Sequence, residues 1–339
     1  MKRVLFFLLL ISSSLFCDTT YKRSEVTKTP TFELLMGSFN ERDQKWRTYR
    51  QKDLADLAFY SSNYYDKIGL LHSGVSSVER IPHVIHFIWV GPKPYPENSV
   101  ANVQSWKELH PDWKMLFWTD DPERPCPVEG MERHLIDEID FILLKPYLSQ
   151  TTNYAEKADV IRYELLYQQG GVYVDHDVSC LRPFDDLHSA YDFYACLENP
   201  HTNTGSDAKI FPCNCLFGAR PRHPILLEAI HQVDQRWEEI GQKYPGLDSK
   251  STFARVINRT FRSFTLAIEN SLSIDGNLDM VLPSAYFFSN KIFNRTTSGI
   301  LLKQGFVYAT HAFASTWRDK KPTTSLKSKK KSSSEQSKA

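Results

Sequence analysis

Hydrophobic and polar positions alternate along the chain with the periods that distinguish strands from helices. A near-continuous apolar run over residues 83–90 is typical of a strand buried on both faces of a parallel sheet. Further segments have the pattern of strands at residues 113–118, 191–197 and 214–217. Others have the pattern of helices at residues 100–109, 131–148, 224–240 and 251–264. This order predicts an α/β fold with a mostly parallel central sheet and helices on both faces.

The segment 153–177 reads as a helix, a glycine stop and a short strand in succession. Asn153 has the side chain of a helix N-cap, and Glu156 three residues later completes a capping-box arrangement. Gly170 and Gly171 supply the left-handed backbone that ends a helix. Apolar residues at helical spacing predict one buried stripe on this helix: Ala155, Ala158, Ile161 and Leu165.

Two carboxylates follow the short strand at its end. Because side chains alternate along a strand, Asp175 and Asp177 leave on the same side, whereas His176 points away. Converging oxygen ligands suit Mg²⁺ or Mn²⁺, and the carboxyl end of a strand in an open α/β sheet is where ligands bind. A bare D-x-D is common by composition, so two solvated acids in a turn are the alternative.

Asp159 and Arg162 lie three residues apart, on one face of the helix before this strand. As a surface ion pair they would contribute little to stability. As part of a site, they would be an acid and a fork-shaped donor directed at hydroxyl groups beside a metal-bound diphosphate. The second interpretation is favoured, because the helix leads directly into the D-x-D strand.

The motif A-x-x-A-D-x-x-R-Y-x-x-L-x-x-x-G-G-x-Y-x-D-x-D, from Ala155 to Asp177, resembles the signature of a known family. This is the DXD-motif sugar transferase family, glycosyltransferase family 32, which includes initiating mannosyltransferases of the yeast Golgi and is related to clostridial glucosylating toxins. Other segments resemble the same family at residues 81–92, 105–121, 213–226 and 309–317. The resemblance covers roughly residues 81–318.

The resemblance implies a GT-A-type nucleotide-sugar-binding fold and a hexosyltransferase. Such an enzyme would move a hexose from a UDP- or GDP-sugar to a glycan, lipid or protein acceptor, with Mn²⁺ or Mg²⁺ as cofactor and with retention of configuration. Two alternatives stay open. One is a non-catalytic sugar-nucleotide-binding or interaction protein. The other is a haloacid-dehalogenase-like phosphatase, whose nucleophile strand residues 172–181 loosely fit.

The resemblance also implies roles for individual residues. Asp177 and Asp175 would hold the metal, and Asp175 would also contact the sugar or ribose. These two carboxylates, with Asp159 and Arg162, are the catalytic candidates. Asp159 and Arg162 would bind hydroxyl groups of the transferred sugar. The remaining donor-binding candidates are Trp89 against the base, Asn214 near the sugar or acceptor, and His311, Ser315 and Trp317 in a C-terminal segment that closes over the diphosphate. Trp89 could equally be a core residue, and Asn214 a strand-end cap.

Composition divides the chain into four parts. With 339 residues and 41% hydrophobic content, it can bury a sizeable core. Residues 1–17 hold an apolar run too short for the roughly 20 residues of a spanning helix, which predicts a signal peptide and no stable membrane span. Residues 18–80 read as a helical extension, 81–318 as the glycosyltransferase domain, and 319–339 as a disordered Lys/Ser-rich tail.

Charge and cysteine content narrow the partners and the compartment. The net charge of +1 hides an acidic body, because the cations are concentrated in the two terminal segments, which argues against a nucleic-acid partner. If Cys17 leaves with the signal, an odd number of cysteines remains, which suits reducing surroundings. Cys213 and Cys215 are expected in the core. We therefore expect a secreted or exported protein, such as a host-directed effector; the alternative is a Golgi-type lumen with a short signal anchor.

Overall fold

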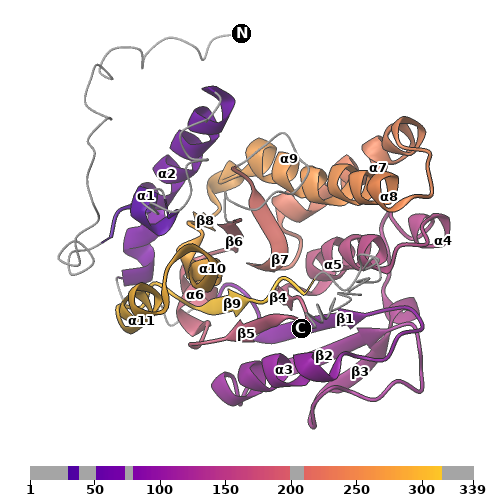
Figure 1. Cartoon of the computed structure of the whole chain (residues 1–339), viewed down its shortest axis with the longest axis horizontal. Helices are drawn as coiled ribbons and strands as arrows, with labels where there is room; N and C mark the ends of the chain where they lie inside the picture. The colour runs from indigo at the N-terminus through magenta and orange to yellow at the C-terminus, as the bar shows by residue number, and fades with distance from the viewer. Residues whose placement is uncertain (1–29, 38–50, 73–78, 199–209, 315–339) are drawn as a thin grey trace, which may run out of the picture.

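The computed structural model describes residues 30–37, 51–72, 79–198 and 210–314 (Figure 1). The predicted signal peptide, the Lys/Ser-rich tail, Ser315 and Trp317 lie outside these residues. Among the described helices, none combines the length and apolar character needed to cross a membrane.

A seven-stranded sheet forms the centre of the molecule, in the order β3-β2-β1-β4-β7-β6-β8. Strands β1 to β4 run parallel to one another, and β6 runs parallel to β8, while β7 is antiparallel to both β4 and β6. A second sheet pairs β5 with β9. The strands are β1 Val84–Trp89, β2 Lys114–Thr119, β3 Glu132–Leu135, β4 Gly171–Val174, β5 Val178–Cys180, β6 Phe193–Leu197, β7 Pro212–Ala219, β8 Asp279–Leu282 and β9 Ala309–His311.

Helices cover both faces of the large sheet. Helix α3 (Glu97–Leu109) connects β1 to β2, and α5 (Tyr154–Gln169) carries the chain back from β3 to β4 in the opposite direction. Right-handed crossovers in opposite directions place these two helices on opposite faces, as Figure 1 shows. The predicted α/β fold with a mostly parallel sheet and helices on both faces is confirmed.

The other helices extend these layers. On the face of α5 lie α7 (Pro224–Lys243), α8 (Ser249–Val256) and α9 (Arg262–Ser271), with a π turn, Ile257–Phe261, between the last two (Figure 1). Helix α2 (Gln51–His72) packs on the edge strand β8, where the Asn63 side chain bonds the backbone of Asp279 and Val281. The remaining helices are α1 Phe32–Leu35, α4 Tyr147–Gln150, α6 Asp185–Ala190, α10 Ala285–Ile292 and α11 Arg295–Lys303, with 3₁₀ turns at Ile136–Glu138 and Ile274–Gly276. The boundaries of the N-terminal extension stay a prediction.

The prediction of a single helix over residues 131–148 is wrong. This segment instead forms β3, a 3₁₀ turn, a loop and the short helix α4. The buried Glu164 carboxylate on α5 accepts the backbone N–H groups of Ile142, Leu143 and Leu144 at 2.8 to 2.9 Å. A distant side chain thus satisfies backbone donors that a helix would have satisfied within itself.

The sheet topology locates a ligand crevice. Strands β1 and β4 are neighbours, but the chain leaves them toward opposite edges of the sheet. Ligands of open α/β sheets bind outside the carboxyl ends of strands at such a switch point. Trp89 ends β1 and Asp175 follows β4, so both lie at this edge.

Candidate functional site

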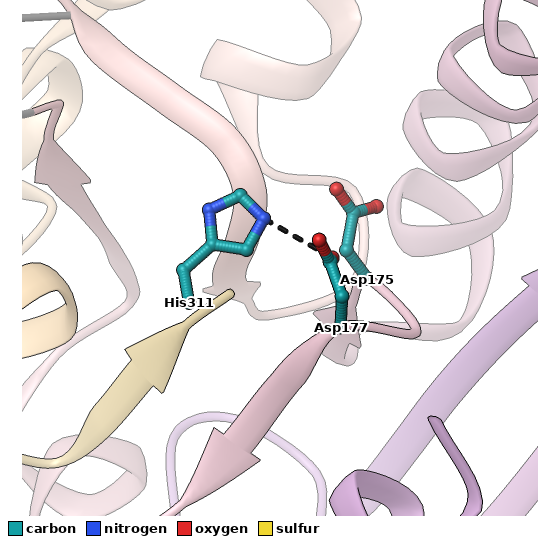
Figure 2. Close-up of side chains that lie close together, drawn as sticks. All are labelled: Asp175, Asp177 and His311. Carbon is teal, nitrogen blue, oxygen red and sulfur yellow. Dashed lines mark hydrogen bonds and ion pairs between the residues drawn. The ribbon is translucent and has the colours of Figure 1, made fainter. Parts of the chain in front are cut away.

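Asp175, Asp177 and His311 form a cluster at the carboxyl end of β4 (Figure 2). Each offers a ligand atom, and these atoms lie within 4.8 Å of one another. His311 Nε2 is 3.1 Å from Asp177 Oδ1. Asp177 and His311 are buried, whereas the Asp175 side chain is 27% exposed and can be reached from solvent.

Pairing of β5 with β9 brings His311 to the two carboxylates. In this ladder Val178 lies opposite His311. Two backbone donors of the same segment hold Asp177: Ala312 N–H bonds its carbonyl at 2.9 Å, and Ala314 N–H bonds Oδ2 at 2.7 Å. The C-terminal segment is thereby fixed against the D-x-D turn, and Ser315 follows directly beyond the described residues.

Charges in this cluster stabilise each other. Burial acts to raise the pKa of Asp177, but the hydrogen bond and charge of His311 outweigh it and hold this pKa below its ordinary value. Burial acts to lower the pKa of His311, but Cys215 and Asp177 outweigh it and raise that pKa. Two carboxylates and an imidazole are a donor set that a divalent cation accepts. The residues present therefore fit a metal ion.

Arg162 links the cluster to a second group of polar residues. Its Nη2 is 3.0 Å from Asp159 Oδ1 and 3.2 Å from Asp175 Oδ1, and Nη1 donates to the Asn214 carbonyl at 2.6 Å. Asp159 and Arg162 are only 6% and 4% exposed, which excludes a surface ion pair. The buried Arg162 guanidinium thus contacts three partners on three elements: Asp159 on α5, Asn214 on β7 and Asp175 in the D-x-D turn.

Tyr173 orients Asp175 and was missed in the sequence. Its hydroxyl donates to Asp175 Oδ1 at 2.5 Å, and the Arg162 guanidinium lies over its ring, 4.0 Å from the centroid. Strand alternation could have found this residue, because positions two apart on a strand face the same side.

Helix α5 differs in two respects from the pattern predicted for it. Asn153 accepts the N–H groups of Ala155 and Glu156 at 3.0 Å, as an N-cap does, but the buried Glu156 carboxylate lies 3.4 Å from Arg259. From Asp159 to Leu166 the helix is buried on all sides, so there is no single apolar stripe. Packing on every side leaves room for charged residues only where they pair with each other.

The glycine stop keeps the α5–β4 turn tight. Gly170 and Gly171 have φ of +66° and +96°, as predicted. A Cβ at Gly171 would lie 2.5 Å from the Val84 carbonyl oxygen of β1. His86 Nε2 lies 2.9 Å from the Gly170 carbonyl, which fixes the start of β4, the strand that Asp175 follows.

Trp89 and His176 lie at the same edge of the sheet. The Trp89 indole N–H donates to the Lys93 carbonyl at 2.8 Å, and the ring meets His176 edge to face at 5.1 Å. His176 Nδ1 is 2.8 Å from the Ser99 hydroxyl, so this side chain packs away from the carboxylates. Contact of Trp89 with a base stays a prediction. Cys213 and Cys215, on either side of Asn214, are buried free thiols, as expected.

The polar network makes the pKa of Asp159 sensitive to its surroundings. Burial raises this pKa from 3.8 to about 6, against the opposing effects of Arg162 and Thr260. A raised pKa means that the folded chain holds the proton more tightly than the unfolded chain. The resulting stabilisation of the fold is fully present at pH values below 3.8, the ordinary pKa, and is lost as the pH rises through about 6.

Asp159→Asn should remove this pH dependence, because the amide does not ionise. Between pH 4 and 7 the wild type should lose up to about 3 kcal/mol of unfolding free energy relative to the variant. Urea unfolding of both proteins across this range measures the difference. A difference that stays constant with pH would contradict the raised pKa.

Comparisons with known proteins match the segment of the chain that contains the D-x-D turn. Residues 96–194 match the family model described as the glycosyltransferase sugar-binding region containing the DXD motif. The chain is similar to inositol phosphoceramide mannosyltransferase 1 of Schizosaccharomyces pombe, with 31% identity over 176 residues, 51% of this chain and 49% of the relative. Mannosyltransferase 3 of that series, in the same yeast, is 37% identical over 153 residues, 45% of this chain and 37% of the relative. The chain thus spans half or less of the length of these relatives.

More distant similarities include a bacterial protein and two toxin structures. Subversion of eukaryotic traffic protein A of Legionella pneumophila is 26% identical over 130 residues, 34% of this chain and 20% of that protein. The UDP-bound glycosyltransferase domain of the YGT toxin has a TM-score of 0.41 and 9% identity, covering 67% of this chain and 90% of the domain. The catalytic domain of alpha-toxin from Clostridium novyi has a TM-score of 0.40 and 12% identity, covering 81% of this chain and 78% of that domain.

The family resemblance predicted from the sequence is confirmed by the family model and the mannosyltransferase relatives. The matched region contains Asp159, Arg162, Asp175 and Asp177, whereas Asn214 and His311 lie beyond it. Residues 96–194 of this chain therefore match the glycosyltransferase sugar-binding region that contains the DXD motif, and they carry the D-x-D turn itself.

Proposed function

We propose that this protein is a metal-dependent glycosyltransferase that moves a hexose from a UDP- or GDP-sugar to an acceptor, with retention of configuration. One observation carries the proposal: the cluster of Asp175, Asp177 and His311 is joined through Arg162 to a buried polar group at the switch point of the sheet. The diphosphate of a nucleotide-sugar needs a cation to neutralise its charge, and the hydroxyl groups of the sugar need hydrogen-bond partners. The two groups supply both within one continuous network.

The metal would be held by Asp177, Asp175 and His311. A bound Mn²⁺ or Mg²⁺ offsets the negative charge that develops on the leaving diphosphate. His311 was expected in a segment closing over the diphosphate, and its contact with Asp177 supports a role at the metal as well. Ser315 and Trp317, a few residues further on, stay predicted donors to the diphosphate oxygens.

The sugar would be bound by Asp159, Arg162 and Asn214, whose positions are fixed before any ligand arrives. Positive charge develops on the sugar as the anomeric bond breaks. Asp175, anchored at one oxygen by Tyr173 and Arg162, places a carboxylate beside that charge. Trp89 would stack on the nucleotide base.

The names of the relatives narrow the substrates and the location. The name inositol phosphoceramide mannosyltransferase suggests a mannose donor for this chain and, of the glycan, lipid and protein acceptors, a lipid. The Legionella protein's name, subversion of eukaryotic traffic, favours export toward a host over a Golgi-type lumen. Subcellular fractionation tests this location: mature protein confined to a periplasm, or N-glycosylated in a lumen, would contradict export.

A panel of donors tests the activity. The full chain is incubated with UDP-glucose, UDP-galactose, UDP-N-acetylglucosamine and GDP-mannose, with MnCl₂ or with EDTA, and free hexose is measured. We expect slow hydrolysis of one donor that requires the metal. Binding of a donor without hydrolysis or transfer would favour the non-catalytic alternative, and cleavage of p-nitrophenyl phosphate without donor binding would favour a phosphatase.

A further inference from the structure

A π turn interrupts the helical run between α8 and α9. The five residues Ile257–Phe261 form it, and Arg259 and Thr260 within it are buried. Single π turns inside α-helices occur often at functional sites, because the extra residue changes the direction of nearby side chains. Here the turn packs on α5, and it lies outside the matched family region 96–194.

Thr260 contacts Asp159, one of the proposed sugar-binding residues, at the carboxylate oxygen that Arg162 does not contact. Its hydroxyl lies 2.5 Å from Asp159 Oδ2 and 2.8 Å from the Val256 carbonyl of its own helix. Arg162 contacts the other carboxylate oxygen, Oδ1, at 3.0 Å. The two oxygens of Asp159 are therefore fixed by separate elements, the π turn and α5.

These contacts close into a ring. Asn214 Nδ2 donates to Asp159 Oδ1 at 3.0 Å and to the Tyr163 hydroxyl at 2.8 Å. The Tyr163 hydroxyl donates to the Thr260 carbonyl at 3.2 Å, which returns the ring to the π turn. Both amide hydrogens of Asn214 thus have partners among the described residues, and its Oδ1 is the acceptor that would bind a substrate hydroxyl.

We propose that Thr260 is a positioning residue for sugar transfer, which holds Asp159 and Asn214 in the orientation that the transferred hexose requires. Without the Thr260 hydroxyl, the buried Oδ2 of Asp159 loses its hydrogen-bond donor. The Asp159 carboxylate could then rotate, because only Oδ1 would still be held. Small displacements of sugar-binding groups lower the rate of the chemical step more than they lower affinity for the nucleotide. The proposal rests on the proposed function.

Thr265 supplies a matched control. It lies in α9, is 1% exposed, and its hydroxyl bonds the Phe261 carbonyl four residues earlier at 3.2 Å. The Thr260 hydroxyl also lies near a carbonyl four residues earlier, that of Val256, and shares its single proton between this carbonyl and Asp159, so Thr260→Val and Thr265→Val both remove a contact within the helix. Only Thr260→Val also removes the bond to Asp159.

The test uses the full chain as wild type, Thr260→Val, Thr260→Ser and Thr265→Val. Hydrolysis of GDP-mannose and UDP-glucose with MnCl₂ gives kcat and KM, and calorimetry gives the Kd for GDP and UDP. For Thr260→Val we expect kcat to fall about 10- to 100-fold, the factor that corresponds to a lost hydrogen bond to a charged group. KM and the nucleotide Kd should change less than about twofold. Thr260→Ser and Thr265→Val should behave as the wild type.

Other outcomes separate the two proposals. An active wild type with an unchanged Thr260→Val, or with equal losses in both valine variants, overturns the role of Thr260 alone. Equal losses of kcat and nucleotide affinity in Thr260→Val would also overturn it, because they indicate general disruption. A well-folded wild type that hydrolyses none of the four donors in the panel described for the proposed function overturns that function, and the positioning role with it.

Discussion

Asp177→Asn is expected to abolish sugar transfer while the fold persists. The amide keeps the size of the side chain but removes the negative charge that would hold the metal. A bound metal stabilises the charge that develops in the transition state by several kcal/mol, so kcat should fall about a thousandfold or more without it. Donor hydrolysis with saturating MnCl₂ measures the loss, and circular dichroism checks the fold.

Asp279→Asn is the control for this substitution. Asp279 is a buried carboxylate whose Oδ1 is 2.9 Å from His223 Nε2 and whose Oδ2 accepts the Ser273 N–H at 2.7 Å. Asp177 has the same pair of partners in His311 and the Ala314 N–H. The control variant should lose stability but keep the kcat of its folded fraction. Normal turnover by Asp177→Asn would show that the proposed metal site is wrong.

Arg162→Ala should lower both stability and sugar transfer. It would leave Asp159 and Asp175 without the cation between them, and breaking a buried pair in this way costs about 3–5 kcal/mol. Arg162→Lys keeps the charge but cannot reach two carboxylates and the Asn214 carbonyl with one planar fork. We expect the lysine variant to fold, to bind nucleotide, and to lose about 100-fold or more in kcat.

Arg182→Lys is matched to the lysine variant. Arg182 also pairs with a carboxylate, Asp186 at 2.7 Å, donates to a carbonyl, Gly305 at 2.6 Å, and lies over a tyrosine ring, Tyr308 at 4.2 Å. Urea unfolding and donor hydrolysis are measured for both variants. A similar loss of kcat in both would indicate that the effect of Arg162 is general loss of packing rather than loss of contact with the sugar.

The sequence was most informative where the structure depends on local signals. The Asn153 cap and the double glycine are encoded within one short segment, and the structure has them as expected. Asp175 and Asp177 do lie close together, but in a turn that follows β4 rather than on the strand. His311 could be placed only by resemblance, because its position depends on the pairing of β5 with β9, 134 residues from Asp177 in sequence.

Features decided by tertiary contacts could not be predicted in this way. Residues 142–144 have apolar character that a helix would also show, but Glu164 of α5 binds their backbone. Thr260 gave no sequence signal, since the π turn that contains it contacts α5 and α7, which are distant in sequence. Buried charges such as Glu156 and Asp159 look like surface residues until their partners Arg259 and Arg162 are placed.

A crystal of the full chain grown with MnCl₂ and the donor it hydrolyses tests the central claim most directly. Data collected at the manganese absorption edge give an anomalous difference map that locates the ion. We predict one peak in contact with Asp177 and within ligand distance of Asp175 or His311, with the donor diphosphate beside it and the hexose against Asp159 and Arg162. A donor bound with no manganese peak at these residues, or with its hexose directed away from Arg162, would contradict the account.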